Sequence, residues 1–358
     1  MSGLDTIRDR IDELDREIQR LISERAACAR KVGLIKQAQG PGARYYRPER
    51  EARILREVLA RNEGPLDGEE MVRLFREIMS ACLALEHPMR IAFLGPEGTF
   101  TQAAVHKHFG HSVTTLPLGA IDEVFREVES GSAHYGVVPV ENSTEGVVNH
   151  TLDMLLGSPL KICGEVELRI HDHLMGKMES LEEVTRIYSH SQSLAQCREW
   201  LDSNLPGVPR EAVSSNAEAA RRASEETGAA AVAGEVAAEL YGLDILARNI
   251  EDHPNNTTRF LIIGVDEVPP SGEDKTSLLV STRNRPGALF QLLQPLARNG
   301  ISMTRIESRP ARQGTWEYVF FFDIDGHRED ARVAAALTEL EEESSLFKVL
   351  GSYPKAVI

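Results

Sequence analysis

Cysteine is scarce in this sequence, and the few cysteines show no pairing pattern. Among 358 residues only Cys28, Cys82, Cys163 and Cys197 occur, without a C-x-x-C pair and too dispersed for a zinc module. We therefore expect free thiols in a reducing compartment and no metal site. The N-terminus lacks the charged start and apolar run of a signal peptide. No stretch approaches the ~18 apolar residues of a membrane span, so the sequence favours a cytoplasmic protein without a membrane partner.

Positive charge is also in deficit. The chain has 40 Lys and Arg against 55 Asp and Glu, a net charge of -15. This balance argues against nucleic acid as the main partner. A hydrophobic content of 42% and a charged content of 27% are ordinary for a globular protein, and the length suggests two or three domains. An anionic substrate would have to be bound by a local cluster of arginine and lysine.

The first part of the chain is predicted to be an all-α module over residues 1–88. Residues 4–37 contain no proline and repeat apolar residues at heptad spacing, which indicates one helix ~50 Å long. A compact domain of this size is only ~30 Å across. Such a helix buries its apolar stripe only against another chain, so we expect a homodimer, with a tetramer left open. Shorter helices are expected at about 48–61 and 68–85.

Alternating strand-like and helix-like segments follow. They predict an α/β domain over residues 89–268, in which two lobes fit the length better than one. A stretch rich in proline and glycine, 269–274, is expected to be a linker. Residues 275–354 then show a β-α-β-β-α-β pattern, which is typical of a ferredoxin-like α+β domain. The predicted fold class is thus multidomain: all-α, two-lobed α/β and ferredoxin-like α+β.

Three cations lie along the inward face of the first predicted helix. Arg25 occupies a heptad position that should be apolar. Lys36 lies three turns later on the same face, and Arg8 lies four heptads before Lys36 beside the stripe. A single arginine of this kind is usually explained by a charged end that reaches the surface, or by a carboxylate partner. Three on one face indicate a dianionic ligand.

The segments Ile7–Asp15, Glu24-Arg25, Val32–Lys36 and Arg47–Glu51 resemble the all-helical chorismate mutase family, an intertwined dimer of three-helix chains. The resemblance implies that chorismate binds in this pocket, with Glu51 on the substrate hydroxyl. Lys36 and Glu86 would act on the ether oxygen, where negative charge develops. The implied chorismate contacts are Arg8 (from the other protomer), Arg25, Lys36, Arg47, Arg50, Glu51, Cys82 and Glu86.

Three of these positions depart from the commonest family pattern. Arg47, Cys82 and Glu86 stand where an aspartate, a serine and a glutamine are frequent. Glu86 can donate a hydrogen bond only while it is protonated. We therefore expect mutase activity to fall as the pH rises and Glu86 ionises. The Arg47 contact is expected to run through its backbone.

Four polar segments, 95–101, 139–144, 189–197 and 256–260, lie near the ends of predicted strands. Ligand sites of open α/β sheets gather at such ends. Each segment taken singly is better explained by turns and helix caps. Together and in this order they resemble prephenate dehydratase, which has two α/β lobes and an active site in the cleft between them.

This second resemblance implies roles for particular residues. Thr258, in the Thr-Arg-Phe signature, would assist departure of the hydroxyl when prephenate loses carbon dioxide. Arg259 would clamp a carboxylate or form a structural ion pair. Glu141 and His190 are possible acids, with a structural role at least as well supported for both. The implied prephenate contacts are Thr99, Thr101, Asn142, Ser143, Ser189, Gln192 and Arg259.

Asn284–Phe290 and Glu307–Pro310 resemble the phenylalanine-binding motifs of ACT domains in this enzyme family. Free N–H groups at the helix start could receive a carboxylate. The resemblance implies that phenylalanine binds between two such domains, although the motifs could instead only stabilise the turn and the dimer. The implied effector contacts are Asn284, Gly287, Ala288, Leu289, Glu307, Ser308 and Arg309.

The three resemblances together imply a bifunctional enzyme that makes prephenate from chorismate, converts it to phenylpyruvate without a cofactor, and is inhibited by phenylalanine. Two alternatives remain open. The central domain could have lost catalysis and only bind an amino acid, although Thr258 and the 139–142 segment argue against this. The chain could also retain only one activity, with the mutase in doubt because of Cys82 and Glu86.

Overall fold

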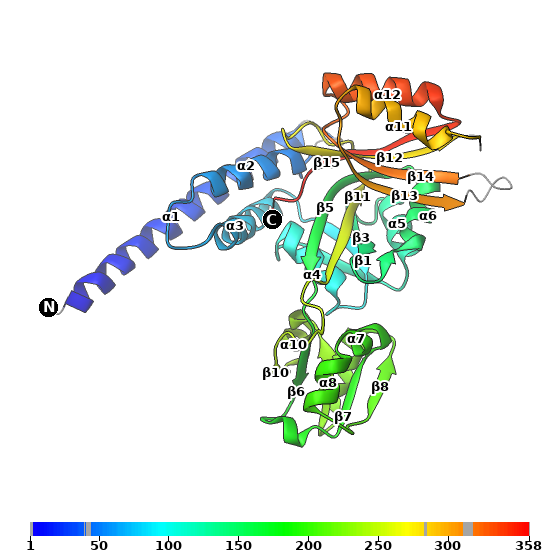
Figure 1. The fold of residues 1–358 in the computed structure, drawn as a ribbon. Coiled ribbons are helices and arrows are strands. Elements are labelled where there is room, and N and C mark those ends of the chain that lie inside the picture. The colour runs from blue at the N-terminus through cyan, green and yellow to red at the C-terminus, as the bar shows by residue number, and fades with distance from the viewer. Residues whose placement is uncertain (1–2, 39, 41–43, 283–284, 311–317, 358) are drawn as a thin grey trace.

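The computed structural model describes residues 3–38, 40, 44–282, 285–310 and 318–357 (Figure 1). A long helix projects from one side, two α/β lobes lie one below the other, and a sheet with two helices covers the upper lobe (Figure 1). The predicted multidomain fold class is confirmed. Among the described residues, no helix combines the length and the apolar character needed to cross a membrane.

The helical module consists of α1 (Gly3–Ala38), α2 (Pro48–Ala60) and α3 (Gly68–Glu86). With 36 residues, α1 is about 54 Å long at 1.5 Å per residue. Gly33 is its only buried residue, and a Cβ there would lie 3.0 Å from the Cα of Glu86, so α1 and α3 approach closely. The apolar stripe of the projecting half stays 40–61% exposed in this chain: Leu4, Ile7, Ile11, Leu14 and Ile18.

The upper lobe is a mixed sheet with strand order β2-β1-β3-β11-β5, to which β4 is added on β3. Strands β1, β2 and β3 are parallel, whereas β11 runs antiparallel between β3 and β5. The lobe comprises β1 (Arg90–Leu94), α4 (Phe100–Phe109), β2 (Thr114–Leu118), α5 (Ile121–Glu129), β3 (Tyr135–Asn142), β4 (Gly146–Val147), α6 (Asn149–Gly157), β5 (Lys161–Arg169) and β11 (Thr257–Gly264).

The lower lobe has strand order β10-β6-β9-β7-β8, and the chain passes between the lobes at 170–172 and 248–256. Its central strand β9 consists of alanine and valine and is fully buried, which lets the alanine-rich helix α9 pack closely. The lobe comprises β6 (His173–Gly176), β7 (Arg186–His190), α7 (Ser191–Gln196), α8 (Arg198–Asn204), β8 (Arg210–Val213), α9 (Asn216–Glu225), β9 (Ala229–Ala233), α10 (Glu235–Tyr241) and β10 (Asp244–Ala247).

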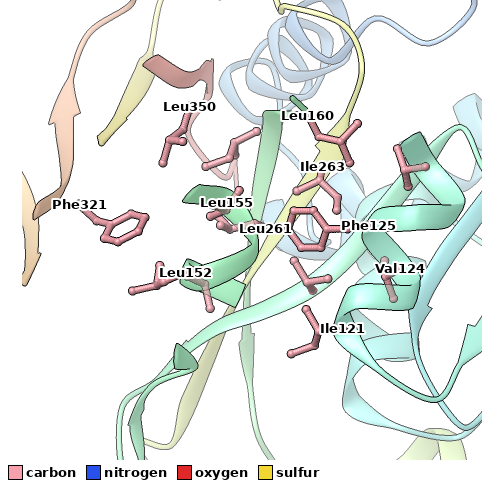
Figure 2. Packing of buried hydrophobic residues seen from close by; sticks show 14 of the residues in the cluster. Ile121, Val124, Phe125, Leu152, Leu155, Leu160, Leu261, Ile263, Phe321 and Leu350 are labelled. Carbon is pink, nitrogen blue, oxygen red and sulfur yellow. The ribbon is translucent and has the colours of Figure 1, made fainter. Parts of the chain in front are cut away.

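The C-terminal module is a sheet of order β13-β14-β12-β15 with α11 and α12 on one face (Figure 1). Its other face shares a core with the upper lobe: Phe321 and Leu350 lie near Leu152, Leu155 and Leu261 (Figure 2). The module comprises β12 (Asp274–Thr282), α11 (Ala288–Arg298), β13 (Met303–Pro310), β14 (Tyr318–Asp325), α12 (Ala331–Glu343) and β15 (Leu346–Pro354).

The stretch expected to be a linker is packed. Asp274 already belongs to β12, is buried, and accepts hydrogen bonds from the backbone and the hydroxyl of Ser271. Arg56 of α2 donates to the carbonyls of Ser271 and Glu273. Val357, beyond β15, packs against the apolar cluster of α2 and α3. The C-terminal module and the segment that leads into it therefore contact the helical module as well as the upper lobe.

Candidate active sites

A cavity of about 460 Å³ opens between the three N-terminal helices. Of the residues implied to bind chorismate, all except Arg8 line it. Arg8 lies on the exposed, projecting half of α1. The lining residues are Arg25, Cys28, Ala29, Val32, Lys36, Tyr45, Tyr46, Arg47, Arg50, Glu51, Ile54, Met79, Cys82, Leu83 and Glu86.

Lys36 and Glu86 form an ion pair in this cavity. The Lys36 Nζ atom lies 3.0 Å from Glu86 Oε2 and 3.1 Å from the carbonyl oxygen of Tyr45. Both side chains are mostly buried, at 19% and 13% exposure. Lys36 can donate to a ligand oxygen here. The Glu86 carboxyl accepts a hydrogen bond in this geometry, in contrast to the donor role expected from the sequence.

Glu51 is a titratable carboxyl group of the cavity whose environment is strongly altered. Burial raises the pKa of Glu51 to about 7, although the charges of Arg76 and Arg25 act in the opposite direction. A carboxyl of this kind changes its charge near neutral pH. Arg47, at the cavity edge, donates from its side chain to Glu49 at 2.8 Å, and its carbonyl accepts the Glu51 N–H.

A chain of side-chain amides leads to Thr258 in the central domain. Thr258 and Asn142 are cross-strand neighbours of β11 and β3, and Asn142 Nδ2 donates to Thr258 Oγ1 at 2.8 Å. The same Nδ2 group donates to Asn256 Oδ1, and Asn256 Nδ2 donates to Gln196 Oε1 of the lower lobe. Because Thr258 Oγ1 accepts from Asn142, its own hydrogen stays available for another acceptor.

Sequence reasoning missed Asn256 and Gln196 as individual residues of this site, although both lie in segments it singled out. Gln196 lies four residues after Gln192, which places the two side chains on the same face of α7. This spacing is the sequence signal that could have identified Gln196. Its Nε2 group is buried and has no hydrogen-bond partner among the described residues. The Asn256–Gln196 hydrogen bond therefore joins the lobes beside Thr258 and leaves a donor to spare.

Several implied prephenate contacts have hydroxyls engaged with the backbone. Thr99 Oγ1 donates to the carbonyls of Leu94 and Pro96, just before α4. Ser143 Oγ donates to the Asn255 carbonyl and accepts from the Thr257 N–H. These are the turn and cap roles weighed as the alternative. Thr101 is buried in the first turn of α4.

In the lower lobe, Ser189 is fully buried, and its hydroxyl donates to the Val232 carbonyl at 2.7 Å. His190 precedes α7, where its Nδ1 accepts from the backbone N–H of Gln192. The structure thus shows His190 as a helix cap. Asn216 contacts Ser189, the His190 backbone and Ser193, and it was not among the residues expected from the sequence.

Arg259 does not join this group. Consecutive strand residues point to opposite faces, so Arg259 faces away from the Thr258 side. Its guanidinium binds Glu165 at 2.8 Å, Asp323 at 2.6 Å and the Tyr353 hydroxyl at 3.1 Å. The geometry corresponds to the structural ion pair, and it does not support a carboxylate clamp.

Glu141 likewise turns to the C-terminal module, where Arg305 Nε lies 2.8 Å from its Oε2. This geometry corresponds to a structural ion pair and does not support an acid at the Thr258 site.

The two expected effector motifs lie on α11 and β13, with Asn284 outside the described residues. Gly287 has φ +79° at the N-terminal cap of α11, a left-handed conformation that favours glycine, and Ala288 and Leu289 follow it in the first turn. Ser308 is exposed on β13, and Glu307 is partly buried beside it. The Arg309 guanidinium lies 3.2 Å from Asp153 of α6, so it contacts the upper lobe.

Three family models match consecutive parts of the chain: Chorismate mutase type II over residues 7–87, Prephenate dehydratase over 91–268 and ACT domain over 276–342. The bifunctional chorismate mutase/prephenate dehydratase of Stutzerimonas stutzeri is 60% identical over 99% of this chain and 98% of its own length. The order of the matched families is the order of the three structural modules.

Solved structures resemble about three quarters of the chain. A prephenate dehydratase from Arthrobacter aurescens in complex with L-Phe is 36% identical, with a TM-score of 0.68, over 74% of this chain and 89% of that one. GqqA, described as a novel type of quorum quenching acylase, is 34% identical, with a TM-score of 0.69, over 75% and 98%. The chain thus belongs to the bifunctional chorismate mutase/prephenate dehydratases, enzymes of phenylalanine biosynthesis that convert chorismate to prephenate and prephenate to phenylpyruvate.

Proposed function

We propose that the 460 Å³ cavity is the chorismate site. The rearrangement is a single pericyclic step, so the protein has to hold one conformer and stabilise charge on the ether oxygen. Lys36 supplies the positive charge that stabilises this oxygen. Arg25 and Arg50 offer guanidinium groups for the two carboxylates of the substrate. The observation that carries this assignment is the convergence of these three cations in one cavity. A ligand would exchange the Lys36–Glu86 hydrogen bond for one to its own oxygen.

The mutase site is completed by a second copy of the chain. The apolar stripe on the projecting half of α1 is 40–61% exposed, and Arg8 lies beside it. A heptad stripe is buried when two such helices pack together. Packing of this kind brings Arg8 of one protomer to the cavity of its partner. The homodimer is therefore the smallest complete mutase.

The dehydratase reaction is centred on Thr258. The ring carboxylate of prephenate leaves as carbon dioxide, its electron pair completes the aromatic ring, and hydroxide departs with a proton as water. Thr258 donates its hydroxyl hydrogen to that departing oxygen, because Asn142 already occupies a lone pair of Oγ1. Gln196 Nε2 is a further donor available to substrate oxygens.

The C-terminal ACT domain binds phenylalanine and lowers dehydratase activity. Gly287 supplies a turn whose following N–H groups are suited to a carboxylate, as at other helix starts. The related dehydratase solved with L-Phe supports this assignment. All four cysteines are unpaired, consistent with work in a reducing cytoplasm.

An acylase, the kind of enzyme that GqqA is described as, would need an activated nucleophile for covalent catalysis. Among the described residues no serine or cysteine side chain hydrogen-bonds to a histidine, so the dehydratase takes precedence. The test is an assay of the full chain with chorismate alone, in which prephenate and phenylpyruvate are followed separately, with and without phenylalanine. Prephenate that accumulates without phenylpyruvate would contradict the dehydratase, and rates unaffected by phenylalanine would contradict the regulation.

A further inference from the structure

Strand β13 carries different side chains on its two faces. Exposure alternates along Met303–Pro310, so that Ile306 and Ser308 are exposed while their neighbours are partly covered. This is the two-residue period of a strand with one face against another layer. The exposed face holds Ser308 of the expected effector motif. The covered face holds Arg305 together with Glu307 and Arg309 of the same motif.

Both arginines reach across to the upper lobe. Arg305 Nε lies 2.8 Å from Glu141 Oε2 of β3, and Arg309 Nη2 lies 3.2 Å from Asp153 Oδ1 of α6. The two arginine side chains are only 13% and 21% exposed. An ion pair whose arginine is mostly buried is more sensitive to small displacements than a pair in water. A movement of β13 therefore changes two ion pairs between this strand and the upper lobe.

One of these places adjoins the dehydratase site. Glu141 immediately precedes Asn142, the residue that donates to Thr258 Oγ1 at 2.8 Å. Because consecutive strand residues point to opposite faces, Glu141 meets Arg305 on one side of the sheet while Asn142 meets Thr258 on the other. A displacement of Glu141 is thereby transferred to the Asn142 amide through one peptide unit.

The Arg259 cluster crosses the same interface but differs in character. Each nitrogen of Arg259 has a partner, and the side chains of Arg259, Glu165 and Asp323 are only 3–11% exposed. In contrast, Glu141 is 39% exposed. Arg305 Nη2 and Arg309 Nη1 are buried without a partner among the described residues. The Arg259 cluster is a fully paired anchor, whereas the β13 pairs keep spare donors and can be rearranged.

We propose that β13 transmits phenylalanine binding to the dehydratase site and that Arg305 is a positioning residue for Asn142 and Thr258. The inference rests on the proposed regulation by phenylalanine. Binding at the exposed face of β13 shifts the strand, the Arg305–Glu141 pair moves with it, and the Asn142 amide changes its distance to Thr258 Oγ1. Phenylalanine then lowers turnover of bound prephenate without competing for its site.

The test uses the full-length chain with Arg305→Gln, Glu141→Gln and the double variant. Phenylalanine binding is measured by calorimetry, and dehydratase kcat and KM are measured against phenylalanine concentration. We expect binding to persist while the half-inhibitory concentration rises roughly five-fold or more, the lower end of usual allosteric coupling. The double variant should match the single variants, because both remove the same pair. Arg305→Lys should recover part of the inhibition.

Arg298→Gln is the matched control, because it removes an exposed ion pair, with Glu339, that joins the two helices α11 and α12 of the ACT domain itself. It should keep the wild-type inhibition curve. Unfolding temperature and mutase turnover show whether each variant is folded. If Arg305→Gln does not fold, Glu141→Gln tests the same ion pair at a position that is 39% exposed and therefore tolerates substitution better. Wild-type inhibition in both glutamine variants, or loss of binding together with inhibition, overturns the proposal. A wild type that phenylalanine neither binds nor inhibits removes the regulation and this inference with it.

Discussion

Asn142 donates an amide hydrogen to Thr258 Oγ1 across neighbouring strands at 2.8 Å. The Asn142 oxygen is held by the N–H groups of Thr144 and Glu145, so the amide has a fixed orientation. The threonine hydroxyl therefore has one lone pair occupied and one hydrogen to give. The geometry therefore supports Thr258 as a hydrogen-bond donor to a bound ligand.

Thr258→Ala should abolish most dehydratase turnover, because it removes the donor to the departing hydroxyl. A positioned proton donor contributes roughly 100-fold or more to a rate. Thr258→Ser keeps the hydroxyl and is expected to retain much of the activity. Mutase turnover, measured on the same preparations, should be unchanged. Dehydratase activity that survives in the alanine variant would show that Thr258 is not the donor.

Glu51 gives a pH prediction for the mutase. Burial raises the pKa of Glu51 to about 7 from its usual 4.5, and the carboxylate is the form that accepts from a substrate hydroxyl. Mutase kcat/KM should therefore rise through pH 7 in the wild type, and Glu51→Gln should lack this rise. The same change in both proteins would assign it to another group.

The shift at Glu51 also affects stability. Its folded pKa is above the unfolded one, so its contribution is complete below about pH 4.5 and is lost as the pH rises through about 7. Glu51→Gln should consequently unfold at a higher temperature than the wild type above pH 7 and show a smaller difference near pH 5. Thermal unfolding across this range measures the effect.

The Lys36–Glu86 ion pair leads to a prediction about substrate binding at the proposed mutase site. Glu86 Oε2 accepts from Lys36 at 3.0 Å, so the carboxylate competes with the substrate for this cation. Glu86→Gln replaces it by an amide that donates at any pH. We expect Glu86→Gln to leave Lys36 more available to the substrate, so that the mutase KM for chorismate falls relative to the wild type while dehydratase turnover stays unchanged. Equal KM values for the two proteins would show that Glu86 does not compete for Lys36.

Mixing two inactive variants tests the shared mutase site. Arg8→Ala and Lys36→Ala should each lose mutase activity, and neither contacts the dehydratase site. If Arg8 acts across the dimer, a mixed dimer has one doubly altered site and one intact site. After random reassortment half of the dimers are mixed, and each mixed dimer has one of its two sites intact. The mixture should therefore recover about a quarter of wild-type activity. No recovery, with mixed dimers verified by mass, would place Arg8 outside its partner's site.

The sequence placed the first-helix cations of the proposed mutase cavity together because the signals there are local. Heptad spacing puts Arg25 and Lys36 on one helix face whatever the surroundings, and both line the cavity. The roles of Arg259 and Glu141 could not be predicted in this way. Their partners Asp323 and Arg305 lie in another module, and a strand pattern does not reveal which layer covers each face. Hydroxyls such as Ser189 serve turns and ligands equally well, so only the folded chain separates these uses.

The seam between the ACT domain and the upper lobe provides a last prediction. Gly351 of β15 lies so close to β5 that a Cβ would overlap the backbone of Ile162. Gly351→Ala must separate the two strands, at a cost on the order of 1–3 kcal/mol as for other overpacked sites. Gly157→Ala, at the end of α6 where a Cβ meets no atom within 4 Å, is the matched control and should be nearly neutral. Because this seam lies beside the Arg259 cluster, the altered protein should also respond less to phenylalanine. Equal unfolding temperatures for the two variants would show that the strands can part freely.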